Sequence, residues 1–142
     1  MNPLRILPLA LGAALVFGAA AHAAETPERE LRMLGRCALA ASVYKSLLPP
    51  ATPPVSANPT EADIALYKRL HDLEPTLKGR ADALAETVDP AMRDGLGKEL
   101  TDQFQAQMAP KGAPRKTPRE ALDLYAPIIE ACIVRAGILA SQ

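Results

Sequence analysis

The sequence predicts an all-α protein: a compact bundle of about four amphipathic helices, some kinked at proline, with one disulfide between the first helix and the last. The first observation is a set of helix-start signals, which lie at Thr26-Pro27, Thr60, Asp89-Pro90 and Thr117-Pro118. The second is that no convincing run of alternating apolar and polar residues predicts a strand. The third is that the two cysteines fall on the apolar stripes of the first and last helices. Because amphipathic helices bury their stripes only against one another, a bundle is the expected architecture.

The segment 1–24 is expected to be a cleaved signal peptide. Arg5 supplies a positive charge, an apolar stretch follows, and Ala21-His22-Ala23 offers the small-x-small pattern that signal peptidase recognises. The alternative is an uncleaved membrane anchor, but a span needs about 20 apolar residues, and this run is shorter and contains a proline. No cysteine lies at the cleavage point, so a bacterial lipoprotein is not expected. We therefore expect cleavage beside Ala24 and export to the periplasm.

The mature chain, 25–142, is expected to form a single helical domain without stable membrane insertion. Cleavage removes Arg5 and His22, which leaves 15 of the 16 basic side chains against 16 acidic ones, a net charge of −1. Such a balance argues against a nucleic-acid binder, which carries a concentrated cationic excess. The two cysteines and the one remaining histidine do not fill the four-ligand set of a structural zinc site without carboxylates. We expect no cofactor and no metal.

The first helix is expected over 27–48. Thr26 is a suitable N-cap, and Pro27 fits the first helical position, where its missing N–H has no intrahelical partner. Its apolar stripe is spaced 3-4-3-4 and consists of Leu34, Cys37, Ala41, Tyr44 and Leu48. The proline-rich segment 49–59 is expected to be an extended connection. A docking segment for a proline-binding partner is the alternative.

The second helix is expected to begin after Thr60 and to reach Val88. Thr60 and Asp63 form a predicted capping box. The apolar positions keep a heptad-like register across Pro75, so we expect a kink or short break there rather than a new direction. These positions are Leu66, Leu70, Leu73, Leu77, Leu84 and Val88.

The third helix is expected over 90–108 and the fourth over 118–139. The stripe of the third is Met92, Leu96, Leu100, Phe104 and Met108, and that of the fourth is Ala121, Tyr125, Ile128, Cys132, Ala136 and Leu139. Thr117 and Glu120 predict a second capping box, and Pro127 predicts a bend in the last helix. Many positions on the helix faces are alanine, which buries little area, so the core is expected to be thin.

Cys37 and Cys132 are expected to pair. Two thiols that face one core in an oxidising compartment usually form a disulfide. The bond would close a loop that spans most of the domain, which stabilises by at most about 4.5 kcal/mol in the chain-entropy account. A redox-active site would need a CxxC motif or an activated thiolate, and the sequence indicates neither.

The segment 109–118 is expected to be a basic loop, and with the start of the next helix it forms a candidate interaction surface. Its cations are Lys111, Arg115, Lys116 and Arg119, with no acid between 111 and 119. Lipid phosphate, anionic polysaccharide or an acidic protein surface could bind such a loop. The alternative is an ordinary solvated loop.

His71 and its neighbours Asp72 and Glu74 are the cluster that most resembles catalytic equipment. A histidine can act as a general base near neutral pH when a carboxylate orients it. No partner nucleophile is identifiable, so we expect no catalytic residue and interpret His71 as a boundary position. The carboxylate pairs are interpreted as solvated faces; they are Glu28/Glu30, Asp72/Glu74 and Asp82/Glu86.

The leading functional hypothesis is an exported periplasmic protein with a non-enzymatic binding role toward a protein partner. It would use a helical face or the 109–118 loop. The alternative is an acid- or envelope-stress chaperone that loosens at low pH as its paired carboxylates become protonated. The third hypothesis is an enzyme that uses His71 and nearby carboxylates.

Overall fold

The computed structural model describes residues 25–49 and 57–142, and these fold into four helices. They are α1 (Pro27–Leu47), α2 (Glu61–Ala85), α3 (Pro90–Met108) and α4 (Pro118–Ala140). No strand occurs in the described ranges. The predicted all-α bundle is therefore confirmed, although α2 ends three residues before the predicted Val88. The signal peptide predicted for 1–24 and the part 50–56 of the proline-rich connection lie outside the described residues.

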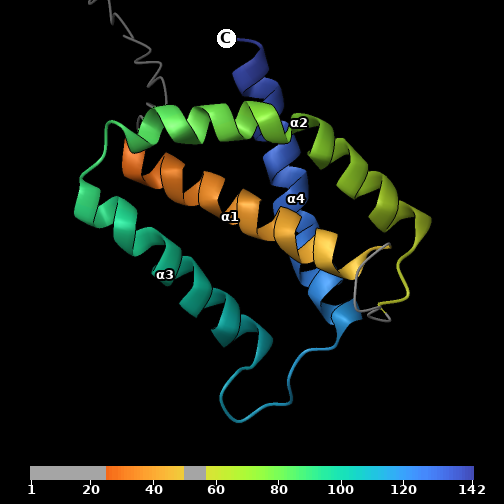
Figure 1. Cartoon of the computed structure of the whole chain (residues 1–142). Coiled ribbons are helices and arrows are strands. Elements are labelled where there is room, and N and C mark those ends of the chain that lie inside the picture. The colour runs from red at the N-terminus through yellow and green to blue at the C-terminus, as the bar shows by residue number, and fades with distance from the viewer. Residues whose placement is uncertain (1–24, 50–56) are drawn as a thin grey trace, which may run out of the picture.

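Helix α1 is the central element of the bundle. It packs against each of the other three helices, and α2 also packs against α4. Figure 1 shows α1 between α2 and α3, with α4 crossing both α1 and α2. Helix α3 packs mainly on α1. The first helix thus connects the whole assembly.

The four helix starts confirm the predicted capping residues. Thr26, Thr60, Asp89 and Thr117 each accept a hydrogen bond from a backbone N–H in the first turn of the helix that follows. The capping boxes at Thr60 and Thr117 are complete, since the third helical residue also accepts from the N-cap N–H. Local sequence chemistry alone therefore determines where every helix begins.

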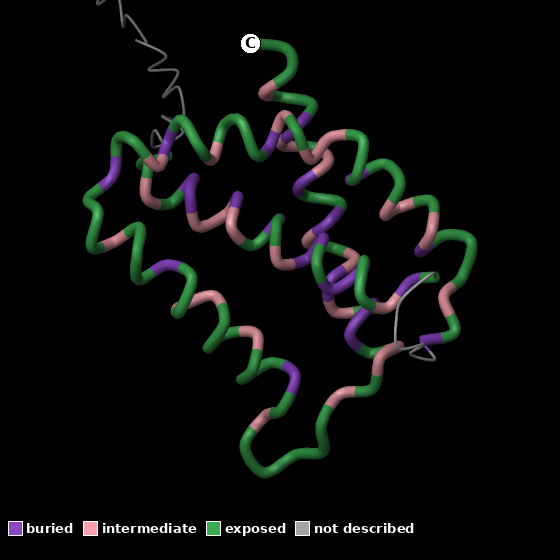
Figure 2. Tube along the Cα trace, viewed as in Figure 1, coloured by how far each residue is buried: buried purple, intermediate pink, exposed green. Residues whose placement is uncertain are grey.

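The core lies between α1, α2 and α4. The predicted stripe of α1 is buried in full. Leu70, Leu122 and Ile129 are each 0% exposed, and the last two lie outside the predicted stripe of α4, because α4 packs on both α1 and α2. Helix α3 buries only Leu96 and Met108, and Figure 2 shows it as mostly exposed. The buried apolar residues include the alanines Ala40, Ala41, Ala57, Ala121 and Ala136.

The internal prolines do not break the helices. Pro75 lies inside α2 and Pro127 inside α4, and each helix is continuous across its proline. Figure 1 shows the two halves of α2 running in different directions, with the second half alongside α1. The expectation of a kink without a new direction was wrong on this point. Pro75 lacks the N–H of a regular helical turn, and its ring crowds the turn before it, which allows the change in direction.

Cys37 and Cys132 form the predicted disulfide. The bond joins α1 to α4 with a Cα–Cα distance of 5.8 Å and a sequence separation of 95 residues. Both half-cystines are buried, at 2% and 1% exposure. The bond therefore fastens the first and last helices inside the core.

Candidate functional site

A groove with a volume of about 710 Å³ runs along α1. One face of α1 forms its floor, the middle of α2 forms one wall, and Leu96 of α3 contributes to the other. The floor consists of Leu31, Leu34, Gly35, Cys37, Ala38, Ala41, Ser42 and Lys45. The α2 wall consists of Leu70, His71, Glu74, Pro75, Leu77, Lys78 and Ala81. Such a volume and a mainly apolar lining are typical of small-molecule sites.

Small residues on α1 and the bend of α2 create this groove. Gly35 lets α3 approach, since a Cβ at this position would come within 2.6 Å of Leu100 Cδ1. Ala38 is exposed although it lies on the groove floor, because no side chain of α2 or α3 covers it. The bend at Pro75 lies in the wall of the groove.

The floor of the groove is apolar at one end and polar at the other. Helices α1 and α2 run antiparallel to each other. The hydrogen bonds from Arg80 near the end of α2 to Glu30 near the start of α1 show this arrangement. Along α1 the lining changes from leucine and glycine to Ser42 and then Lys45. The antiparallel α2 wall places Ala81 and Lys78 toward the apolar end of the floor and Leu70 and His71 toward its polar end.

His71 lies at the rim of this groove. Its side chain is 65% exposed, and its Nδ1 is 3.7 Å from Glu74 Oε1. The ring of Tyr67 is 5.9 Å away between centroids. His71 is therefore an exposed residue, whereas a boundary position was expected. Asp72 is exposed on the same helix, and no group of three potential metal ligands occurs in the described ranges.

Glu30 corrects the interpretation of the carboxylate pairs. It was expected on a solvated face, but it is 4% exposed and joins three helices. Arg80 of α2 donates two hydrogen bonds of 2.9 Å to it, and Arg135 of α4 donates another. These arginines, Arg80 foremost, lower the pKa of Glu30 to about 2 against the opposing effect of burial. Glu30 lies one turn before Leu34, so the apolar stripe extended backward predicts its burial.

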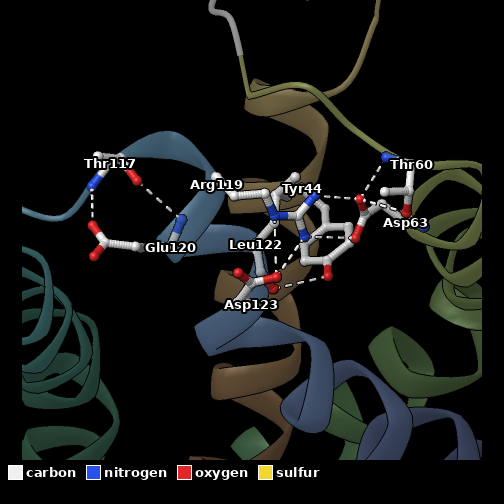
Figure 3. Close-up of polar contacts among 8 residues, drawn as sticks. All are labelled: Tyr44, Thr60, Asp63, Thr117, Arg119, Glu120, Leu122 and Asp123. Carbon is white, nitrogen blue, oxygen red and sulfur yellow. Dashed lines mark hydrogen bonds and ion pairs between the residues drawn. The ribbon is translucent and has the colours of Figure 1, made fainter.

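Asp63 forms a second buried ion pair at the opposite end of α1. Arg119 donates two hydrogen bonds to it, Nη1 to Oδ2 at 2.6 Å and Nη2 to Oδ1 at 3.0 Å (Figure 3). Arg119 also donates to Asp123, and Asp63 accepts from the Thr60 backbone N–H. The hydrogen bonds from Arg119 are the main reason why the pKa of Asp63 lies well below its usual range.

Tyr44 lies beside this ion pair. Its hydroxyl donates to the Leu122 carbonyl oxygen at 2.9 Å, and the residue is 0% exposed. Burial, reinforced by the negative charge of Asp63, raises the pKa of Tyr44 to about 12. The buried phenol stays neutral and ties α1 to α4.

These contacts also correct the role expected of Arg119 in the basic surface. Arg119 lies in the first turn of α4, and its guanidinium is held by Asp63 and Asp123. Lys111 and Arg115 are exposed, and Lys116 is half-buried, with its N–H bonded to the Met108 carbonyl oxygen. Gly112 has a φ of +79°, the left-handed conformation that favours glycine in a turn. The exposed cations of the loop are therefore Lys111 and Arg115.

Sequence reasoning did not identify the groove. Its lining residues come from three helices, and a stripe pattern does not show which part of a helix stays uncovered. The positions between the apolar stripe and the outer face, above all Gly35 and Ala38, were the available signal.

No family model, no curated protein and no solved structure matches this chain. Within the described ranges, no helix has the length and apolar character needed to cross a bilayer.

Proposed function

We propose that this is an exported periplasmic protein with a non-enzymatic binding role, and that the groove along α1 is its binding site. The single observation that carries the proposal is an open, mainly apolar groove of about 710 Å³. Each Å² of apolar surface left in contact with water costs roughly 25 cal/mol of free energy. A ligand that buries this surface recovers that free energy. A small domain with such an uncovered surface gains stability when a ligand covers it.

The polar clusters support a structural role rather than a chemical one. Glu30 and Asp63 are each held by arginine, which does not lose its proton near neutral pH. His71 is exposed and lies against Glu74, with no nucleophile beside it among the described residues. The export signal in 1–24 and the disulfide support an oxidising compartment.

The experiment is a titration of the mature protein with an apolar fluorescent dye at pH 7. We expect saturable binding of one dye per chain. Ala38→Trp fills the floor of the groove from an exposed position, so this variant should keep its helical circular dichroism and lose the dye. Ala106→Trp, at an exposed position of α3 outside the groove, is the matched control. Equal binding by both variants would contradict the proposal.

A further inference from the structure

From the polarity of this groove we infer that its ligand is a single-chain fatty carboxylate. Its acyl chain would lie along α1 and its carboxylate would pair with Lys45. The inference rests on the proposed binding function and specifies the chemistry of the ligand. Three features of the groove carry it: its cross-section, its change of polarity and the charge at its polar end.

The cross-section fits one extended chain. The floor from Leu31 to Lys45 spans 14 helical steps, about 21 Å at 1.5 Å per residue. Spread over that length, the 710 Å³ of the groove correspond to a mean section of about 34 Å². An acyl chain has no side chains and fits a narrow groove floored by glycine and alanine.

The change of polarity orients the chain. Leu31 and Leu34 of α1 and Leu96 of α3 line the groove where the methyl end would lie. Ser42 and Lys45 line the floor at the other end, about two turns beyond Leu34. A ligand with one apolar end and one polar end matches this sequence of residues, whereas an entirely apolar ligand would leave Ser42 and Lys45 against hydrocarbon.

Lys45 supplies a positive charge at the polar end of the floor. Glu74 and His71 lie against each other at the rim, with 3.7 Å between Oε1 and Nδ1. Lys78 on the wall pairs with Asp82 at 2.6 Å. Lys45 is exposed, lies in the last turn of α1, and has no ion pair within the described ranges. Its ammonium is therefore the groove cation available to a carboxylate.

The test measures displacement of the groove dye by dodecanoate, dodecan-1-ol and dodecyltrimethylammonium, each below its aggregation limit. We expect dodecanoate to bind most tightly. Affinity along the series from octanoate to tetradecanoate should rise by up to about fourfold per methylene until the groove is full. Lys45→Met should weaken the binding of dodecanoate about fivefold, the size of effect expected for an exposed ion pair. It should leave the affinity for dodecan-1-ol unchanged. Lys68→Met, at an exposed position of α2 outside the groove, is the control.

Reversing the charge at Lys45 should strengthen the binding of a cationic ligand and weaken that of an anionic one. Lys45→Glu should bind dodecyltrimethylammonium more tightly than the unmodified protein does and dodecanoate less tightly. Equal affinity for dodecanoate and dodecan-1-ol with no effect of Lys45→Met would overturn the inference while the binding function stands. Displacement by an amphipathic helical peptide but not by dodecanoate would do the same. Absence of dye binding would instead remove the proposed function itself.

Discussion

Asp63 at the start of α2 and Arg119 at the start of α4 form a two-pronged ion pair, with N–O distances of 2.6 and 3.0 Å. The pair joins the N-terminal turns of two helices. The macrodipole of α2 favours the Asp63 carboxylate in its first turn, whereas that of α4 disfavours the Arg119 cation. Asp63 and Asp123 offset that unfavourable position by neutralising the guanidinium.

Arg119→Ala should therefore lower the free energy of unfolding by about 3 kcal/mol, because it leaves the Asp63 carboxylate buried without its partner. Arg119→Lys should recover only part of the loss, since an ammonium does not make the two-pronged contact. Urea denaturation measures both. Arg115→Ala, in the exposed loop, should change the free energy by no more than about 0.5 kcal/mol. A loss as large for Arg115→Ala as for Arg119→Ala would contradict the assignment.

The Glu30 cluster predicts how stability depends on pH. The pKa of Glu30 is lowered from 4.5 to about 2 in the folded protein. The stabilisation is therefore complete above about pH 4.5 and is lost as the pH falls toward 2, because protonation is easier in the unfolded chain. The pKa of Asp63 is also lowered, so protonation of Asp63 causes a further loss of stability below about pH 4. Urea midpoints between pH 7 and pH 2 should stay level to about pH 5 and then decline.

Glu30→Gln should reduce the stability at pH 7 by about 2–4 kcal/mol and flatten the acidic decline. Glu28→Gln, two positions away in the same helical turn, should change the stability by less than about 1 kcal/mol and keep the decline. The level stretch above pH 5 also tests the stress-chaperone hypothesis. A protein that already loosens at pH 5.5 would support that hypothesis and would show that the Glu30 pair does not control acid stability.

The disulfide predicts a non-additive pair of variants. Cys37→Ser and Cys132→Ser should each lower the free energy of unfolding by about 2–5 kcal/mol in oxidising buffer. The double variant should cost little more than either single one, because the first change already removes the link. Thiol labelling of the denatured unmodified protein should find no free cysteine. Strictly additive losses would indicate that each side chain acts through packing instead.

The signal peptide expected in 1–24 predicts where an exported form of the protein would begin. Material recovered from the periplasm should begin near Ala24 or Glu25, because the small-x-small pattern ends at Ala23. Intact mass and N-terminal sequencing measure this. Retention of Met1 in that fraction would show that the segment is not cleaved.

The helices could be predicted from the sequence because their determinants are local. The caps at Thr60 and Thr117 need only residues three positions apart, and the buried stripe of α1 follows from the helical period alone. The burial of Glu30 was missed because a charge was assumed to lie on a solvated face. Its position in the register, one turn before Leu34, was the better guide.

The groove could not be predicted because it depends on how helices meet. Its opening follows from the change in direction at Pro75, and the sequence determines the presence of a bend but not its size. The approach of α3 over Gly35 depends on contacts with Leu100, which is far away in sequence. The partners of Arg119 likewise come from the tertiary arrangement, so its charge was assigned to the surface loop.

The sequence separation of 95 residues between Cys37 and Cys132 also sets an order of events during synthesis of the chain. At synthesis rates of about 5–20 residues per second, Cys132 follows Cys37 after about 5–19 s. During that interval α2 has been synthesised and can pack against α1, but α4 has not. The Cys37 thiol therefore has no native disulfide partner. The native crosslink therefore cannot guide the early docking of α1. It can form only on helices that the apolar stripes and the arginine pairs have already brought together, and it then slows their separation.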